Sequence, residues 1–253
     1  MAKITTITNP LTGQPAQVDQ LEHTAQQIDD GLNIARGVSN PNLLDNWYFA
    51  NPVNQRNVSG TIDAVGYFLD RWKLVSGSVT IGSNGITLNG TIVQILETAV
   101  GTDVTASALT TEGVVVASYD NNSKTISLTG TGQTFVAAKL ELGSQQTLAH
   151  QDADGNWVLN EIPNYGEQLR RCQRYYYRDT FDIGMDAAGV YGNQNRAMLF
   201  FPQTMRTRPS VTVTPATGYA APIPVVLSKN EVLLYTSSGV NWGLQILEAT
   251  ADL

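Results

Sequence analysis

The chain has 253 residues, of which 42% are hydrophobic and 15% are charged, and its formal net charge at pH 7 is −7. An acidic chain disfavours nucleic acid as a partner, because binding to phosphates needs a basic surface. No apolar run approaches the length of a membrane-spanning helix, so we expect no membrane span. Cys172 is the single cysteine, which excludes a disulfide within the chain and is consistent with folding in a reducing cytosol.

Residues 1–16 form a short polar segment that is interrupted by Pro10, Gly13 and Pro15. This composition predicts an extended arm, and an arm ahead of an oligomerising helix is a natural docking peptide. We therefore expect residues 1–16 to anchor the protein to a partner. A frayed terminus is the alternative interpretation.

Apolar residues then recur at alternating spacings of three and four. The seam consists of Val18, Leu21, Ala25, Ile28, Leu32 and Ala35. A repeat of about 3.5 residues keeps one stripe turned toward a partner helix, so the pattern predicts a coiled-coil helix over residues 17–37 that joins copies of the chain. One amphipathic helix packed on its own domain is the alternative.

Residues 40–164 read as short alternating strands separated by turn residues, with no helical segment between them. Residues 83–85 (Ser-Asn-Gly) predict a hairpin between strands at 79–81 and 86–88. Residues 120–123 predict another between strands at 114–119 and 125–128, and 133–142 alternates again. This arrangement predicts an all-β domain of the jelly-roll β-sandwich class.

The segment 143–166 carries little pattern apart from the turn from Asp152 to Trp157. Its carboxylates resemble a calcium loop, but Glu161 falls too early to serve as the bidentate ligand. We expect a plain polar turn there, with no metal.

Residues 165–253 predict a smaller C-terminal β-sandwich. A helical turn at 167–172 leads into three tyrosines at 175–177, and a tight turn at 228–231 joins two strands. The strands are expected at 198–201, 211–213, 225–227, 232–235 and 244–247.

Several segments together resemble a known family. They are residues 42–46 with Phe49, 54–56, Tyr67 with 70–72, 138–143, 165–169, 172–176, 201–202, 205–213 and 249–253. Their order and spacing resemble a recurring module of bacteriophage fibre and receptor-binding proteins. The resemblance implies a carbohydrate-binding-like jelly roll followed by a small β-sandwich, displayed as a homotrimer on the virion surface after assembly in the host cytoplasm. The segment 144–164 is longer than is usual in that family.

Sugar binding needs aromatic faces beside groups that hydrogen-bond hydroxyls. We select Tyr191, Asn193 and Asn195, in the glycine-rich loop 184–196, together with Trp242 as candidate glycan contacts. Further aromatic residues are more simply read as core; they are Trp47, Tyr48, Tyr67, Trp72 and Tyr175–Tyr177. A basic cluster of Arg170, Arg171, Arg174 and Arg178 has two interpretations, an anionic-glycan site or pairing with acids of a neighbouring subunit.

Catalytic patterns are weak in this chain. His23 and His150 cannot build a metal cluster, no nucleophile elbow is present, and Cys172 is most simply a small core residue. We expect no catalytic residue, metal or cofactor. The expected function is that of a homotrimeric phage tail or capsid fibre that is anchored by residues 1–16 and attaches to host glycans. A structural connector, collar or capsid-decoration fibre is the alternative, and a glycan hydrolase is less favoured.

Overall fold

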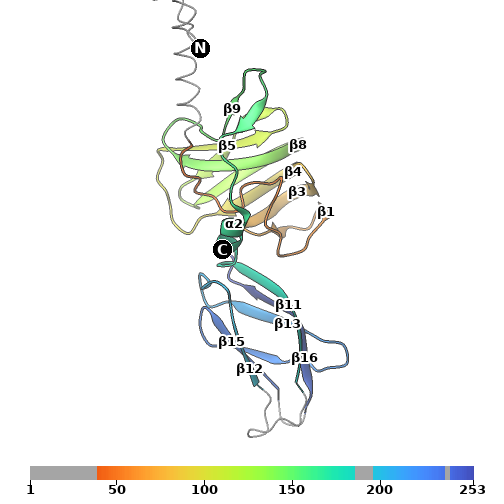
Figure 1. The fold of residues 1–253 in the computed structure, drawn as a ribbon. Coiled ribbons are helices and arrows are strands. Elements are labelled where there is room, and N and C mark those ends of the chain that lie inside the picture. The colour runs from red at the N-terminus through yellow and green to blue at the C-terminus, as the bar shows by residue number, and fades with distance from the viewer. Residues whose placement is uncertain (1–38, 186–195, 237–239) are drawn as a thin grey trace, which may run out of the picture. The chain divides into compact units, whose positions relative to one another are not determined.

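The computed structural model describes residues 39–185, 196–236 and 240–253 (Figure 1). The predicted arm, the seam from Val18 to Ala35 and the candidates Tyr191, Asn193 and Asn195 lie outside these residues, so those predictions stay predictions. The chain divides into two compact units. One comprises Met1–Pro41 and Thr147–Glu161, and the other Asn42–Gln146 and Ile162–Leu253. The predicted division into 40–164 and 165–253 likewise stays a prediction.

The described part of the chain is mostly β-sheet with one short helix, which confirms the all-β class. Eight strands form one antiparallel sheet in the order β1-β3-β4-β8-β5-β6, with β2 also on β3 and β7 also on β8 (Figure 1). The bounds are β1 (Gly60–Ile62), β2 (Gly66–Leu69), β3 (Trp72–Gly82), β4 (Gly85–Ile95), β5 (Val104–Thr110), β6 (Gly113–Val116), β7 (Ser118–Asp120) and β8 (Thr125–Leu142).

Both predicted hairpins of this sheet are confirmed. Gly82 pairs with Gly85 across the first turn, and Asp120 pairs with Thr125 across the second. The predicted continuous strand 114–119 is wrong, because the chain changes partner at Ala117. β6 pairs with β5, whereas β7 pairs with β8. The Ala117 amide donates to the carbonyl of Ala106, which closes the pairing with β5 at the change of direction.

Two glycines allow β3 and β4 to approach closely. A Cβ built on Gly77 would lie 2.0 Å from the carbonyl oxygen of Asn89, and one on Gly90 would lie 2.1 Å from that of Ser76. Both residues also have positive φ, +75° and +145°, which side-chain-bearing residues rarely adopt. No other residue type fits this crossing without moving a strand.

The smaller unit contains a hairpin that the sequence pattern did not predict, with β9 (Ala149–Gln151) paired to β10 (Trp157–Leu159). Its turn is closed by Asp152, whose carboxylate accepts hydrogen bonds from the amides of Asp154 and Asn156. This is a polar turn, as predicted. Across the described residues, no group of three or more His, Cys, Asp or Glu side chains could hold a metal ion.

The remaining elements form helix α2 (Tyr165–Cys172) and two three-stranded antiparallel sheets. Asn164 caps α2 by accepting from the amide of Glu167 at 3.1 Å. One sheet has the order β11-β16-β13 and the other β12-β15-β14 (Figure 1). The bounds are β11 (Tyr176–Met185), β12 (Arg196–Phe200), β13 (Ser210–Pro215), β14 (Ile223–Val226), β15 (Glu231–Tyr235) and β16 (Trp242–Thr250).

The two C-terminal sheets share one apolar core. It includes Val232 and Leu234 of β15 and Leu244 and Leu247 of β16, all buried. Because inward side chains of both sheets meet in it, the sheets pack as a small sandwich. In the described residues, no helix is long and apolar enough to cross a membrane.

Candidate functional site

Trp242 is not a glycan contact, and that prediction is wrong. Its side chain is 0% exposed and belongs to the core between the two C-terminal sheets. Leu244 and Val232, buried in the same core, account for the burial, because the inward face of β16 packs on the inward face of β15. A ring enclosed in this way has no free face for a sugar to stack on.

Trp47, Trp72 and Tyr175–Tyr177 agree with the core interpretation, whereas Tyr48 and Tyr67 are only partly buried. Trp47 and Trp72 are buried, and the indole N–H of Trp72 donates to the carbonyl of Asn46 at 2.9 Å. Phe49 packs edge-on against Trp72, with ring centroids 5.1 Å apart. Cys172 is also buried, and burial raises the pKa of its thiol well above the usual value, so the residue is not an activated nucleophile.

The arginine cluster pairs with acids of the same chain, which neither interpretation from the sequence anticipated. Arg171 lies 3.5 Å from Asp45, Arg174 lies 3.3 Å from Glu97, and Arg178 lies 3.0 Å from Glu248. Since three of its four members already face carboxylates, the cluster is a poor site for an anionic glycan.

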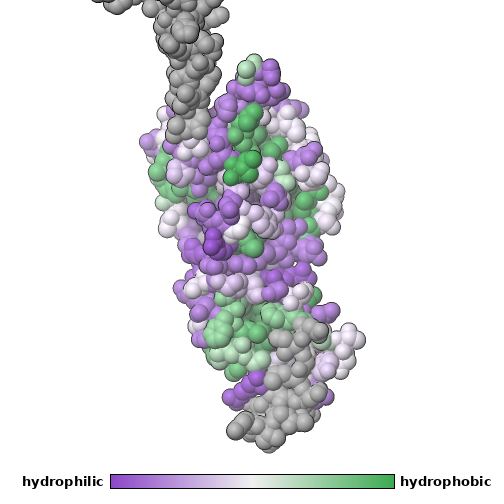
Figure 2. Space-filling view, in the orientation of Figure 1, coloured by the Kyte–Doolittle hydropathy of each residue, from purple (hydrophilic) through white to green (hydrophobic). Residues whose placement is uncertain are grey.

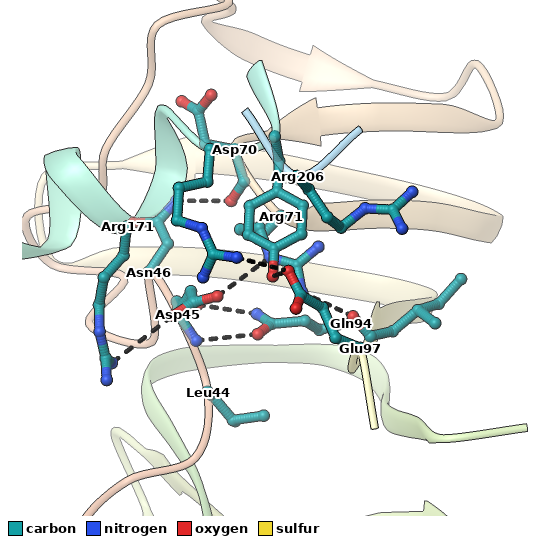
Figure 3. A network of polar contacts seen from close by, with 12 residues as sticks. Leu44, Asp45, Asn46, Asp70, Arg71, Gln94, Glu97, Arg171 and Arg206 are labelled. Atoms are coloured by element: carbon teal, nitrogen blue, oxygen red, sulfur yellow. Dashed lines mark hydrogen bonds and ion pairs between the residues drawn. The ribbon is translucent and has the colours of Figure 1, made fainter. Parts of the chain in front are cut away.

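Arg71 is the centre of a polar network that joins the first sheet to the segment after α2 (Figure 3). Its guanidinium is 2% exposed, pairs with Asp45 at 3.2 Å and donates to the carbonyl of Ile95 at 2.6 Å. It also lies 3.6 Å from the ring centre of Tyr175, whose hydroxyl donates to Glu97 at 2.6 Å. These groups pair with one another, apart from Nη1 of Arg71, which is buried with no hydrogen-bond partner, and we interpret the network as structural.

A second set of contacts holds the end of the chain. Arg56 pairs with Asp252 at 2.5 Å, and its guanidinium stacks over Tyr176 at 3.9 Å and Tyr67 at 5.0 Å. The Tyr67 hydroxyl donates to the carbonyl of Leu253 at 2.6 Å. Asp252 and Leu253 are thereby held by Arg56, in the loop before β1, and by Tyr67 of β2.

The candidate site is a hollow of about 650 Å³ beside β5, β6 and β7. Its lining combines short apolar side chains of β5 and β6 with hydroxyl and amide groups. The polar side chains are those of Thr102, Thr105, Ser107, Tyr119, Asp120, Asn121, Asn122 and Gln146. A mainly apolar wall with several placed hydrogen-bonding groups is typical of small-ligand sites, which span about 300–1,000 Å³.

The hydroxyl of Tyr119 is held at the edge of this hollow by two hydrogen bonds. It accepts from the amide of Val100 at 3.2 Å and donates to the side-chain carbonyl of Asn121 at 3.3 Å. Asn121 in turn accepts from the amide of Gly101 at 2.9 Å. The ring is therefore held in place by the protein itself, which would lower the entropic cost of stacking a ligand on it.

Ser107 is the unusual member of the lining. It is 2% exposed, and its hydroxyl oxygen is buried with no hydrogen-bond partner. Its neighbour across the β5–β6 pairing is Val116, whose side chain is 92% exposed. Buried hydroxyls are nearly always hydrogen-bonded, so the absence of a partner for this oxygen is unusual.

The electrostatics of the hollow are set by Asp120. Its carboxylate accepts from the Ser123 hydroxyl at 2.7 Å and from the amides of Asn122 and Ser123. These bonds, that of the hydroxyl first, lower the pKa of Asp120 below its usual value. The lining therefore carries a carboxylate that is ionised at neutral pH, and its described residues include no Lys, Arg or His.

The sequence contained part of this site. Residues 120–123 have the composition of a turn, and such a turn places Tyr119 directly before it and Asn121 within it. Ser107 could not be selected, because one serine in an alternating strand shows neither its burial nor its lack of a partner. Comparisons with known proteins find no family, no curated protein and no solved structure that matches this chain.

A second surface feature is the outer face of the β12-β15-β14 sheet. Along β12 the exposed side chains alternate with partly buried ones, and Met198 and Phe200 are 46% and 64% exposed. In register beside Met198 lie Leu233 and then Val225, and Ile223 of β14 is half exposed. Figure 2 shows apolar side chains at the surface of the C-terminal strands. The outer face of this sheet therefore has an apolar centre, with Arg196 and Glu231 on the same face.

Proposed function

We propose that this protein is a homotrimeric bacteriophage virion fibre protein whose first β domain binds host-surface glycans. The observation that carries the glycan-binding part is the hollow beside β5, β6 and β7, with its fixed tyrosine and its hydroxyl and amide lining. The resemblance across residues 42–253 supports the fibre assignment. In this proposal the eight-stranded sheet is a carbohydrate-binding-like jelly roll.

The chemistry of the hollow suits a sugar. A pyranose ring offers an apolar face of C–H groups to an aromatic ring, and hydroxyls that both donate and accept around its edge. Tyr119 supplies the aromatic ring, and Thr105, Asn121 and Asn122 supply hydrogen-bonding groups of both kinds. The basic cluster in and after α2 is not part of this site, because three of its four members pair with acids of this chain.

A glycan array probed with the full-length protein tests the proposal. We expect binding to at least one bacterial envelope glycan, a fall of tenfold or more in affinity for Tyr119→Ala, and a smaller loss for Tyr119→Phe, which keeps the ring. Tyr165→Ala removes a tyrosine that is 45% exposed at the start of α2 and is the matched control. Absence of binding across the array, or wild-type binding by a folded Tyr119→Ala protein, would refute the glycan-binding function.

The oligomeric and anchoring parts of the proposal rest on the sequence. The seam from Val18 to Ala35 supplies the register of a trimer, and residues 1–16 dock onto other virion proteins with the avidity of three linked copies. Light scattering should give a trimer mass, and replacing Leu21 and Ile28 with Asp should reduce it. A protein lacking residues 1–16 should remain trimeric yet fail to enter particles; wild-type incorporation would contradict the docking role.

A structural connector or capsid-decoration fibre is a second candidate, and the apolar outer face of the β12-β15-β14 sheet favours it. The occupant that we propose for this face is a second copy of the chain. Phe200, Met198 and Ile223 together expose about 300 Å² per copy, taking roughly 200 Å² for a fully exposed large side chain. A stable dimer buries about 800 Å² per partner, so this face would join copies that the helical seam already brings together.

Cysteine cross-linking tests that second role. Under mild oxidation, Met198→Cys should form disulfide-linked oligomers, whereas Ser76→Cys, at an exposed position of β3, should not. Because the native Cys172 is buried, it should contribute little cross-linking of its own. Equal rates of cross-linking at the two positions would show that the outer face does not join copies.

A further inference from the structure

We propose that the hollow beside β5, β6 and β7 binds an uncharged saccharide, and that the buried hydroxyl of Ser107 hydrogen-bonds a hydroxyl of that saccharide. This inference rests on the proposed glycan-binding function and specifies its substrate class. Two independent observations carry it: the unpartnered Ser107 oxygen in the lining, and the charge of the groups around it.

The first observation is the state of Ser107. A hydroxyl that leaves water without gaining a hydrogen bond destabilises the folded protein. Ala106 and Ala108, its neighbours on β5, show that a small apolar side chain is accommodated in this strand. An alanine at position 107 would fill nearly the same volume without that penalty, so the hydroxyl is unfavourable for folding alone. A ligand that hydrogen-bonds the Ser107 hydroxyl would explain why a serine occupies this position.

The chemistry of Ser107 indicates what such a ligand must offer. A serine hydroxyl donates one hydrogen bond and accepts others, so its natural complement is a group that does both. Sugar hydroxyls have this property, whereas a carboxylate only accepts and an ammonium only donates. The pairing therefore favours a polyhydroxylated ligand over a simple ion.

The second observation disfavours anionic sugars. Asp120 is held ionised by its three hydrogen bonds, and the described lining has no Lys, Arg or His to balance it. A uronic acid or phosphate group placed in the hollow would meet this carboxylate within a chain of net charge −7. Such a group would lose its hydration without gaining a cation.

The experiment uses the full-length protein and pairs of oligosaccharides that differ in one group, a glucose-containing oligomer and its glucuronic-acid analogue. Calorimetric titration should give at least tenfold tighter binding of the uncharged member. Asp120→Asn keeps one of the two oxygens that close the turn and removes the charge. It should improve binding of the glucuronic-acid analogue about two- to fivefold, as expected for one screened, exposed charge.

Ser107→Ala supplies a readout that a purely structural serine would not give. We expect affinity for the uncharged oligomer to fall about three- to tenfold, the effect of one neutral hydrogen bond. At the same time the melting temperature should stay constant or rise by about 2–4 °C, since an unsatisfied hydroxyl has been removed. Ser76→Ala, an exposed serine of β3, should change neither quantity.

The outcomes separate the two levels of the proposal. Failure to bind any glycan of either charge would overturn the proposed function itself. Equal or tighter binding of the acidic analogue would leave glycan binding in place and overturn the uncharged class. If Ser107→Ala binds the uncharged oligomer as tightly as the wild type, then Ser107 does not contact the sugar.

Discussion

Asn46 is the residue whose replacement we expect to damage the first β domain most. It is 2% exposed and has a left-handed backbone, with φ of 52°. Its side-chain oxygen accepts from the amide of Val53 at 2.7 Å, and its NH₂ group donates to the carbonyls of Val53 and Asp70, both at 2.8 Å. One side chain thus closes the loop 46–53 and ties it to the turn before β3.

Asn46→Ala removes all three hydrogen bonds and leaves three main-chain groups inside the protein without partners. Each neutral hydrogen bond contributes about 0.5–1.5 kcal/mol, and each orphaned buried group costs about 1–3 kcal/mol. Alanine also tolerates positive φ less well than asparagine, at a cost of roughly 1 kcal/mol. We therefore expect the free energy of unfolding to fall by about 4–6 kcal/mol, well above the effect of a typical substitution, about 1 kcal/mol.

Urea unfolding followed by tryptophan fluorescence measures this effect directly, because Trp72 donates its indole N–H to the Asn46 carbonyl. Asn51→Ala, at an exposed position of the same loop, is the matched control and should change stability by less than about 0.5 kcal/mol. Asn46→Gly relieves the backbone strain alone and should recover about 1 kcal/mol relative to alanine. A loss under about 1 kcal/mol for Asn46→Ala would refute the reasoning, since the three bonds would then be dispensable.

Three further predictions concern buried or crowded positions. Burial raises the pKa of Asp70 to about 6 from 3.8 in the unfolded chain, so the folded state binds this proton more tightly. Its contribution to stability is then fully present below about pH 4 and lost as the pH rises to about 6, roughly 3 kcal/mol in all. Asp70→Asn should flatten that pH dependence in urea titrations; parallel curves would contradict it. Gly90→Ala should lower the free energy of unfolding by about 3 kcal/mol or more, measured in urea, because its new Cβ would clash with backbone atoms. Gly66→Ala is the control: the φ of Gly66 is similar, but no atom lies within 4 Å of the added Cβ, so the loss of stability should be smaller. Arg56→Lys keeps the charge but loses the stacking on two tyrosines, and should speed carboxypeptidase removal of residues 251–253; an unchanged rate would show that the stacking is not needed.

The turns of the first sheet were predictable because their chemistry is local. Ser83 and Asn84 lie between glycines that pair directly, and Asp120 organises its own turn through bonds to residues two and three positions later. Such contacts depend on neighbours in sequence, so the residue types are sufficient evidence. The pairing of the strands on either side of these turns could therefore also be predicted from the sequence.

The rest depended on contacts between distant residues. The change of strand partner at Ala117 depends on a hydrogen bond to the carbonyl of Ala106. The burial of Trp242 depends on the packing of the β12-β15-β14 sheet against the inward face of β16. Neither contact leaves a periodic signal in the sequence. The basic cluster near α2 was misread for the same reason, because Asp45 and Glu97 lie far from it in the chain.

The two surfaces to which we assign a function can be separated, because no strand is shared between them. The hollow belongs to β5, β6 and β7 in the eight-stranded sheet, whereas the apolar outer face belongs to β12, β14 and β15. Ser107→Ala changes a small side chain in the first sheet, and Met198→Cys changes an exposed one in the second. Each variant should therefore leave the other property intact, since distant and unconnected sites act independently. A protein that cross-links through position 198 and still binds an uncharged glycan would be an adhesin whose second β domain also joins its copies, and the adhesin and connector roles would then be two properties of one fibre.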